Sequence, residues 1–254
     1  SYNLNKILFD DQNKYDTIYR KRIIKIYNMT QSEYFLDSTL RLHAIMIMGN
    51  SGDSEFGNIL IKELLSQDLK NAKFRIKAIE SLGKLRYAKS SNSIHPFLGK
   101  EKLFLEKLAA AGALGNIGNK SSIQPLINLI KGWPENWLPS DGPELRWEAA
   151  ISLLKLGYID GITQNLINNL IDRKYLKDVK EYDREQKKNN TLNQNKIDFV
   201  ILKILTIINS IDDLSLTQPF KDNIYKLSNS DPNLEIRDFA KKVYSRFNYP
   251  ENIK

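Results

Sequence analysis

The sequence predicts an all-α protein, a right-handed α-solenoid of about five to six helical hairpins. Three observations support this prediction: a short pattern recurs along the chain, its apolar residues follow a helical period, and Gly or Pro residues mark turns between the periodic segments. A chain of 254 residues is long for one globular core but ordinary for such an array. A hydrophobic content of 41% is enough for a packed interior and argues against disorder.

The repeat is clearest around an alanine, which we use as its anchor. Ala44, Ala78, Ala110 and Ala149 lie 34, 32 and 39 residues apart, and Ala240 is the anchor of a later copy. Units of this length bury their apolar faces only against their neighbours. A base stands three residues before each anchor: Arg41, Arg75, Lys107, Arg146 and Arg237. A large side chain stands four residues after it: Met48, Leu82, Leu114, Leu153 and Tyr244.

Each unit has the composition of a helical hairpin. Gly49, Gly83 and Gly115 follow the first apolar segment, and we expect them to end the first helix because Gly adopts left-handed dihedrals cheaply. A second periodic segment follows the turn. A proline is tolerated in the first turn of a helix, because its missing N–H would have no helical partner there. Prolines fall at the start of three second segments: Pro96, Pro125 and Pro219.

This pattern of base, alanine, Leu-Gly, turn and I-x-P-L-I resembles HEAT repeats, most closely the short kind of the phycobilisome lyases. The resemblance covers Leu40 to Leu170 well and Asn195 to Phe247 loosely. It implies a fold but no single function, because the family includes lyases, hydroxylases, glycosylases and plain scaffolds. It also implies that the bases stack along the array and pair with an acid at a neighbouring turn. The candidate acceptors are Asp53, Asp160 and Asp213, with Asn119 a weaker one.

The repeats define the predicted domain organisation. Residues 1–35 form an N-terminal capping helix region, residues 36–247 the HEAT-like solenoid with insertions at 132–143 and 172–195, and residues 248–254 a C-terminal tail. The N-terminal helix carries a basic edge, so a membrane-surface or partner-binding helix is the alternative to a cap. That edge consists of Arg20, Lys21, Arg22 and Lys25.

The two insertions differ in composition. Residues 132–143 contain Trp133 and Trp137 among three Pro and two Gly, so these Trp side chains either fold back on the repeats or form a partner-contact site. Residues 172–195 mix charges of both signs, which predicts a solvated helix and a mobile loop, or else a basic docking segment. Trp147, by contrast, stands in an apolar column of the repeat and should be in the core.

The residue inventory argues against several chemistries. The chain has no Cys, which excludes disulfides and thiolate nucleophiles. Its two histidines, His43 and His95, are isolated and lack the His-Glu dipeptides of the HEAT-type di-iron hydroxylases. The glycines near Lys120 do not make a phosphate-binding loop, because Asn119 precedes that Lys and a helix precedes the glycines. We expect no catalytic residue, no cofactor and no metal.

The second helices are expected to line the concave face of the array. Their predicted outward side chains are polar, mildly basic and poor in acid, so they suit an extended peptide or an acidic partner, with a merely solvated face as the alternative. The predicted partner-binding residues, beside Trp133 and Trp137, are Asn58, Lys62, Asn128, Lys131, Asn165 and Asn169. Three further outward positions are Asn168, Asn223 and Lys226.

The function predicted from these features is a non-enzymatic scaffold that binds another protein through its concave face and the Trp133/Trp137 loop. The alternatives are a nucleic-acid-binding module similar to HEAT-like DNA glycosylases, and a bilin lyase-like enzyme. The net charge of +8 permits an acidic partner but also fits compositional drift in an AT-rich genome. No segment is apolar enough to span a bilayer. The chain starts at Ser1 rather than Met, which slightly favours export to a bacterial periplasm over the cytoplasm.

Overall fold

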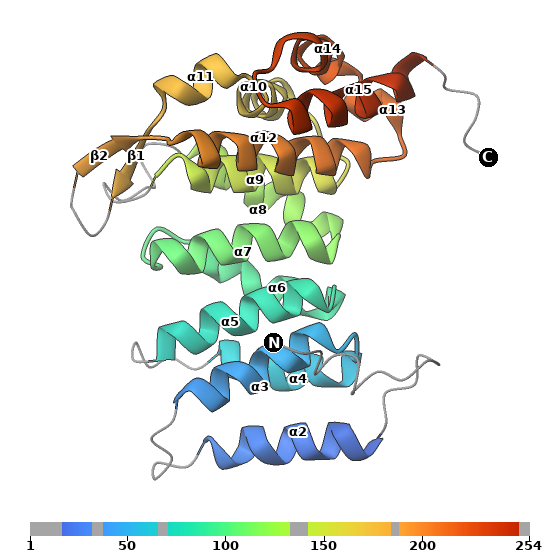
Figure 1. The fold of residues 1–254 in the computed structure, drawn as a ribbon. Helices are drawn as coiled ribbons and strands as arrows, with labels where there is room; N and C mark the ends of the chain where they lie inside the picture. Colours follow the sequence, from blue (N-terminus) through green and yellow to red (C-terminus); the bar gives the residue numbers. More distant parts are fainter. Residues whose placement is uncertain (1–16, 32–37, 66–70, 133–141, 184–187, 249–254) are drawn as a thin grey trace. The chain divides into compact units, whose positions relative to one another are not determined.

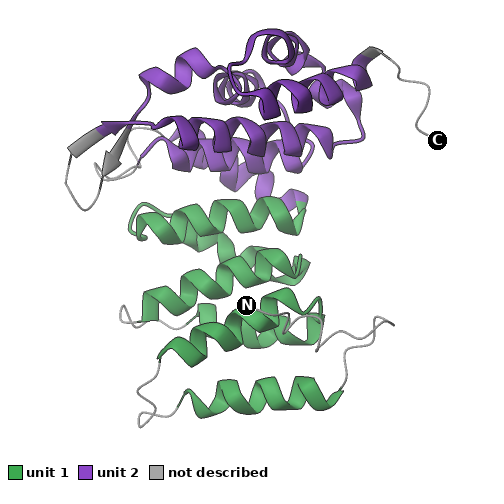
Figure 2. Ribbon diagram, in the orientation of Figure 1, with its two compact units in different colours: residues 1–119 green, residues 120–254 purple. Residues whose placement is uncertain are grey.

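The computed structural model describes residues 17–31, 38–65, 71–132, 142–183 and 188–248. The chain divides into two compact units, residues 1–119 and residues 120–254 (Figure 2). Both consist almost entirely of helices, so the predicted all-α repeat fold is confirmed (Figure 1). The predicted boundaries of the cap, the solenoid and the tail stay predictions. Among the described residues, no helix is long and apolar enough to cross a bilayer.

The first unit is a stack of helical hairpins. Its long helices α2, α3, α5 and α7 follow one another, and each packs on the next (Figure 1). Shorter helical segments connect them and form the second helix of each hairpin. The bounds are α2 Thr17–Met29, α3 Ser38–Asn50, η1 Ser54–Phe56, α4 Gly57–Leu64, α5 Ala72–Lys84, η3 Ala88–Ser90, α6 Ser91–Ile94, η4 His95–Leu98 and α7 Phe104–Ile117.

The second unit adds further hairpins and one small sheet. Its bounds are η5 Lys120–Ser122, α8 Ile123–Lys131, α9 Glu144–Lys155, α10 Gly161–Leu170, α11 Arg173–Asp178, β1 Lys180–Asp183, β2 Lys188–Thr191, α12 Gln194–Asn209, α13 Leu214–Thr217, η6 Gln218–Phe220, α14 Lys221–Ser230 and α15 Leu234–Asn248. The two strands pair antiparallel, with Lys180 opposite Thr191.

The hairpin of β1 and β2 corrects our reading of the second insertion, for which we expected a helix and then a loop. The helix is present as α11, but strands follow it. Strands are usually recognised by alternating apolar residues. The sequences KEYD and KNNT of these strands contain only one apolar side chain, so the usual signal was missing.

The alanine anchors lie in the core, as the repeat pattern predicts. All five are buried, as are the large residues Met48, Leu82, Leu114 and Leu153 four positions later. Trp147 is buried too, which confirms its assignment to the core. An alanine at the anchor lets neighbouring helices approach closely, and the large residue one turn later fills the space beside it.

The column glycines stand in the last turn of the first helices but do not adopt the left-handed dihedrals that we expected. Gly49 and Gly83 are the penultimate residues of α3 and α5 and lie at points of close helix packing. A Cβ on Gly49 would lie 2.5 Å from the Cβ of Ser81, and one on Gly83 would lie 2.8 Å from the Cα of Ala113. Gly at these positions therefore allows one repeat to approach the next. Left-handed dihedrals occur instead at other residues: Gly52, Gly118, Gly157 and Arg86.

The bases also have partners other than those expected. Arg41 pairs with Glu63 at 2.7 Å, and its guanidinium lies 4.3 Å from the ring centroid of Phe74. Arg75 pairs with Glu106 at 2.7 Å. Phe74 and Glu106 occupy the same column, four residues before the next anchor, so each of these two bases contacts the first helix of the following repeat. For these two bases the acids, Glu63 and Glu106, lie within helices and not at the turns, and the stacking of all five bases stays a prediction.

The turn aspartates cap helices instead. The Asp160 carboxylate accepts from the Thr163 N–H at 2.8 Å, and the Asp213 carboxylate accepts from the Ser215 N–H at 2.9 Å. Asp53 accepts from the Glu55 N–H at 3.0 Å and also pairs with Arg20 of α2. An Asp just before a helix satisfies N–H groups that have no partner within it, which explains why these residues stand there.

Candidate binding surface

In the first unit, α4 exposes two of the predicted partner-binding residues. Leu60, Leu64 and Glu63 turn inward and are buried, so Asn58 and Lys62 on the other side are exposed. The Asn58 side-chain oxygen accepts from the Tyr87 hydroxyl at 3.2 Å. This leaves the amide N–H groups of Asn58 available to a partner.

In the second unit, α8 presents a similar pair. Its buried side is formed by Leu126, Ile127, Leu129 and Ile130. Asn128 and Lys131 are exposed, and the Gln124 side-chain amide donates to the Asn128 side-chain oxygen at 2.7 Å.

Lys131 lies close to Asp160, the cap of α10. Burial of the Asp160 carboxyl opposes its ionisation, but the hydrogen bond from Thr163 and the nearby Lys131 ammonium outweigh that effect and hold the pKa of Asp160 below its usual range. The charge of Lys131 is therefore partly compensated within the protein.

Helix α10 continues the amide-rich surface. Asn165 is exposed and Asn169 is half-buried, while Leu166, Ile167 and Leu170 form the buried side. Asn168, between them, accepts from the side-chain amide of Asn223 on α14 at 2.9 Å. The structure thus brings amide groups from two successive second helices together.

These second helices share a charge pattern. The only acid within α4, α8 and α10 is Glu63, which is buried and paired with Arg41. Their exposed polar side chains are Asn, Gln and Lys: Asn58, Lys62, Gln124, Asn128, Lys131 and Asn165. We name those of the second unit, Gln124, Asn128, Lys131 and Asn165, together with Asn169, the second-helix surface. Trp133 and Trp137, the remaining predicted partner-binding residues, lie outside the described residues.

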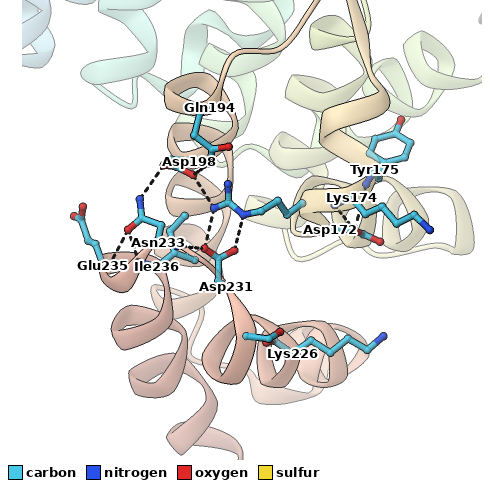
Figure 3. A network of polar contacts seen from close by, with 12 residues as sticks. Asp172, Lys174, Tyr175, Gln194, Asp198, Lys226, Asp231, Asn233, Glu235 and Ile236 are labelled. Carbon is cyan, nitrogen blue, oxygen red and sulfur yellow. Dashed lines mark hydrogen bonds and ion pairs between the residues drawn. The ribbon is translucent and has the colours of Figure 1, made fainter.

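Sequence reasoning missed a buried ion-pair cluster in the second unit (Figure 3). Arg173, at the start of α11, contacts both carboxylate oxygens of Asp231 at 2.8 and 2.9 Å and Asp198 of α12 at 2.6 Å. Asn233 and Gln194 each donate to Asp198 at 2.8 Å. Burial alone would raise the pKa of Asp198, but these hydrogen bonds and the Arg173 charge hold it below its ordinary value.

A pocket of about 170 Å³ lies beside this cluster. Two of the outward positions predicted from the sequence, Asn223 and Lys226, line it together with Lys174 of α11 and Asp231. No local signal could have revealed this site, because Arg173 and Asp231 are 58 residues apart in the sequence. The mixed charges of residues 172–195 predicted a solvated helix and a mobile loop, or a basic docking segment, but no ion-pair cluster.

A second pocket, of about 290 Å³, lies in the first unit. Its apolar lining includes Leu65, Pro96, Phe97 and Leu103, and the Arg75–Glu106 ion pair contributes polar atoms. Both charges of that pair are already engaged with each other, and Ser93, Glu101 and Lys102 add further polar groups, so the lining is mixed.

The two histidines occupy different environments. His43 is exposed, and His95 is half-buried, which lowers its pKa. Within the part of the chain that the structure describes, no group of three His, Cys, Asp or Glu residues is arranged to hold a metal ion.

Comparison with known proteins supports the repeat assignment. A family model described as the PBS lyase HEAT-like repeat matches residues 107–132, from α7 through the turn at Gly118 to the end of α8. Curated proteins give no significant match. The HEAT-like repeat predicted from the sequence is thereby confirmed.

Among solved structures, the chain is similar to one from the complex of CpcE and CpcF of phycocyanin lyase from Nostoc sp. PCC7120. The two chains are 16% identical, the match covers 92% of this chain and 98% of that chain, and the TM-score is 0.43.

Proposed function

We propose that this HEAT-repeat protein is a non-enzymatic scaffold that binds an extended, acidic segment of another protein on its second-helix surface. One observation carries the proposal: α8 and α10 expose amides and the Lys131 ammonium group, and neither helix contains an acid. Such a surface can form hydrogen bonds along an acidic chain.

The amides suit an extended backbone because of their chemistry. An Asn side chain carries both a donor and an acceptor, so it can pair with the N–H and the C=O of one peptide unit. An extended segment leaves those groups unpaired, whereas a helix uses them internally. Asn165 and Asn169 are one helical turn apart on α10, so both can face the same segment.

The ammonium group of this surface adds preference for acidic side chains. Lys131 is exposed at the C-terminal end of α8, where the carboxylate of a partner can reach its ammonium group. Exposed ion pairs contribute about 1 kcal/mol or less each, so they select among partners more than they supply affinity. The amide hydrogen bonds and the ion pairs together predict weak to moderate affinity.

The test is fluorescence anisotropy with a labelled Glu-rich extended peptide and a Lys-rich peptide of the same length. We expect the acidic peptide alone to bind. Asn165→Ala with Asn169→Ala should weaken its binding about 10- to 30-fold, as expected for the loss of two amide pairs of about 1 kcal/mol each. Asn195→Ala, at an exposed position of α12, is the matched control.

A charge-matched pair of variants separates specific from general attraction. Lys131→Ser should weaken binding, whereas Lys241→Ser, on α15, removes the same charge and should not. Equal losses in both variants would contradict a defined surface. Labelled duplex and single-stranded DNA are run in parallel: tight DNA binding that falls steeply with salt would overturn the proposal in favour of nucleic-acid recognition.

A further inference from the structure

Helix α2 has an inner face that is firmly held within the first unit. Ile23 and Tyr27 are buried, and the Tyr27 hydroxyl donates to Glu63 of α4. Arg20 pairs with Asp53 at 2.6 Å. These contacts fix the rotation of α2 about its axis, so its opposite face is presented to the outside in a defined way.

The outer face of α2 combines apolar and basic side chains. Ile18, Ile26 and Met29 are 55%, 39% and 55% exposed. Lys21, Arg22 and Lys25 are exposed on the same side, because positions three, four, seven and eleven residues apart share one face of a helix. We call these six residues the α2 outer face.

No acid balances the charge of the α2 outer face from within the helix. Helix α2 contains no Asp or Glu. Among the described residues, no ion pair involves Lys21, Arg22 or Lys25. Asp53 and Glu63, the described acids that contact α2, are engaged on its inner side by Arg20, Tyr27 and Arg41. The α2 outer face therefore presents exposed cations and exposed apolar side chains to one ligand.

We propose that the α2 outer face docks an acidic amphipathic helix of a partner protein. The long helices α2, α3, α5 and α7 each pack on the next, so a helix on the outer side of α2 would add one more layer of the same kind. Such a helix would place apolar residues against Ile18, Ile26 and Met29, and carboxylates three and four residues apart beside the cations.

The arrangement of the side chains favours a protein over a membrane. A helix that lies in a lipid surface separates its apolar sector from its basic sector. On α2 the two sectors overlap: at 100° per residue, Arg22 falls between Met29 and Ile26, Lys25 falls beside Ile18, and Lys21 lies beyond Lys25. Insertion of the apolar side chains into lipid would bury Arg22, whereas a partner helix can pair it with a carboxylate.

The experiment uses the full chain and a labelled helical peptide with one row of Leu flanked by Glu. The control peptide carries Lys in place of Glu. We expect only the acidic helix to bind, and Lys21→Glu with Lys25→Glu should weaken its binding at least about tenfold. Ile18→Ser with Met29→Ser should weaken binding comparably without lowering the melting temperature, because both side chains are exposed. Lys241→Glu with Lys242→Glu matches the charge change at a distant site and should have no effect.

Three outcomes would overturn the inference. The first is equal binding of the acidic helix to wild type and to the Lys21/Lys25 variant. The second is that the wild type binds phosphatidylserine vesicles but not the acidic helix, and that the Lys21/Lys25 variant no longer binds the vesicles. The third is a photo-crosslink from position 25 to this chain's own residues 1–16, which would mean that the chain covers the face itself. The Asn165/Asn169 variant leaves α2 intact, so it tests the proposed function without changing the α2 outer face. A negative result for one of the two proposals therefore does not decide the other.

Discussion

A single buried carboxylate, that of Glu63, joins three helices of the first unit. Its side chain is fully buried and accepts from the Tyr27 hydroxyl of α2 and from Arg41 of α3 at 2.7 Å. Burial and the Glu63 charge raise the pKa of Tyr27, so its hydroxyl keeps its proton at neutral pH and remains a donor. Glu63 of α4 thereby holds α2 and α3 together.

Replacing Glu63 by Gln tests this role. The change keeps the shape of the side chain but leaves the Arg41 guanidinium without its counter-charge, and breaking a buried ion pair in this way costs about 3 to 5 kcal/mol. We expect the free energy of unfolding, measured with urea, to fall by an amount of that order. Glu55→Gln, at an exposed position, is the control and should change it by less than about 0.5 kcal/mol. An equal effect of both changes would show that Glu63 does not organise the helices.

At the scale of elements, the Arg173 cluster ties the insertion to the repeats. Helix α11 has only six residues and one buried apolar side chain, Leu176. Its connection to α12 and to the turn between α14 and α15 comes from Arg173, through Asp198 and Asp231 (Figure 3). A helix this short is not stable by itself, so the ion pairs decide where it lies.

Replacing Arg173 by Met should release α11. Two carboxylates would lose their cation, and we expect about 3 kcal/mol of destabilisation and faster amide exchange in residues 173–178. Lys174→Met, at the exposed neighbouring position, should leave the free energy of unfolding and the amide exchange of α11 unchanged. Unchanged exchange in the Arg173 variant would mean that packing of Leu176 alone holds the helix.

The same cluster predicts how the stability of the fold changes as pH falls. The pKa of Asp198 is lower in the folded state than its ordinary value of about 3.9. Its ionised form therefore stabilises the fold fully above that value, and this contribution is lost as pH falls through the lower, folded pKa. In the Arg173→Met variant the folded pKa of Asp198 should rise towards its unfolded value, so Asp198 contributes less stability at neutral pH and the variant should lose less stability on acidification than the wild type. Urea melts between about pH 7 and pH 3 measure this difference.

At the scale of the whole molecule, the two compact units each contain their own close packing of repeats. Repeat arrays are stabilised by contacts between neighbours, so a local defect should act mainly on the units that touch it. In the first unit, α5 packs against α7 where Gly83 lies against Ala113.

Gly83→Ala should therefore destabilise the first unit. Alanine favours helices by about 1 kcal/mol, but the added Cβ meets the backbone of Ala113, and overpacking of this kind costs about 1 to 3 kcal/mol. Hydrogen exchange should rise chiefly within residues 1–119. Gly161→Ala is the control, since its Cβ would meet nothing within 4 Å, and it should be neutral or slightly stabilising. A stabilised Gly83 variant would contradict the close approach.

The sequence by itself determined the helical hairpins, the buried alanine anchors and the place of Trp147 in the core. These features depend on the 3.6-residue period and on contacts within a repeat or with its neighbour, so they are visible in a short stretch of chain. The exposure of Asn58, Lys62, Asn128, Lys131 and Asn165 was predictable for the same reason.

Only the tertiary structure decided how the polar side chains pair and what the glycines do. Helical periodicity shows which face a residue occupies but not which distant group it meets, so the partners of Glu63 and Arg173 could not be inferred. The glycines carry the same sequence signal at a helix end and at a close helix crossing, and only the position of Ser81 and Ala113 distinguishes the two. Long-range packing, which local sequence does not encode, makes these choices.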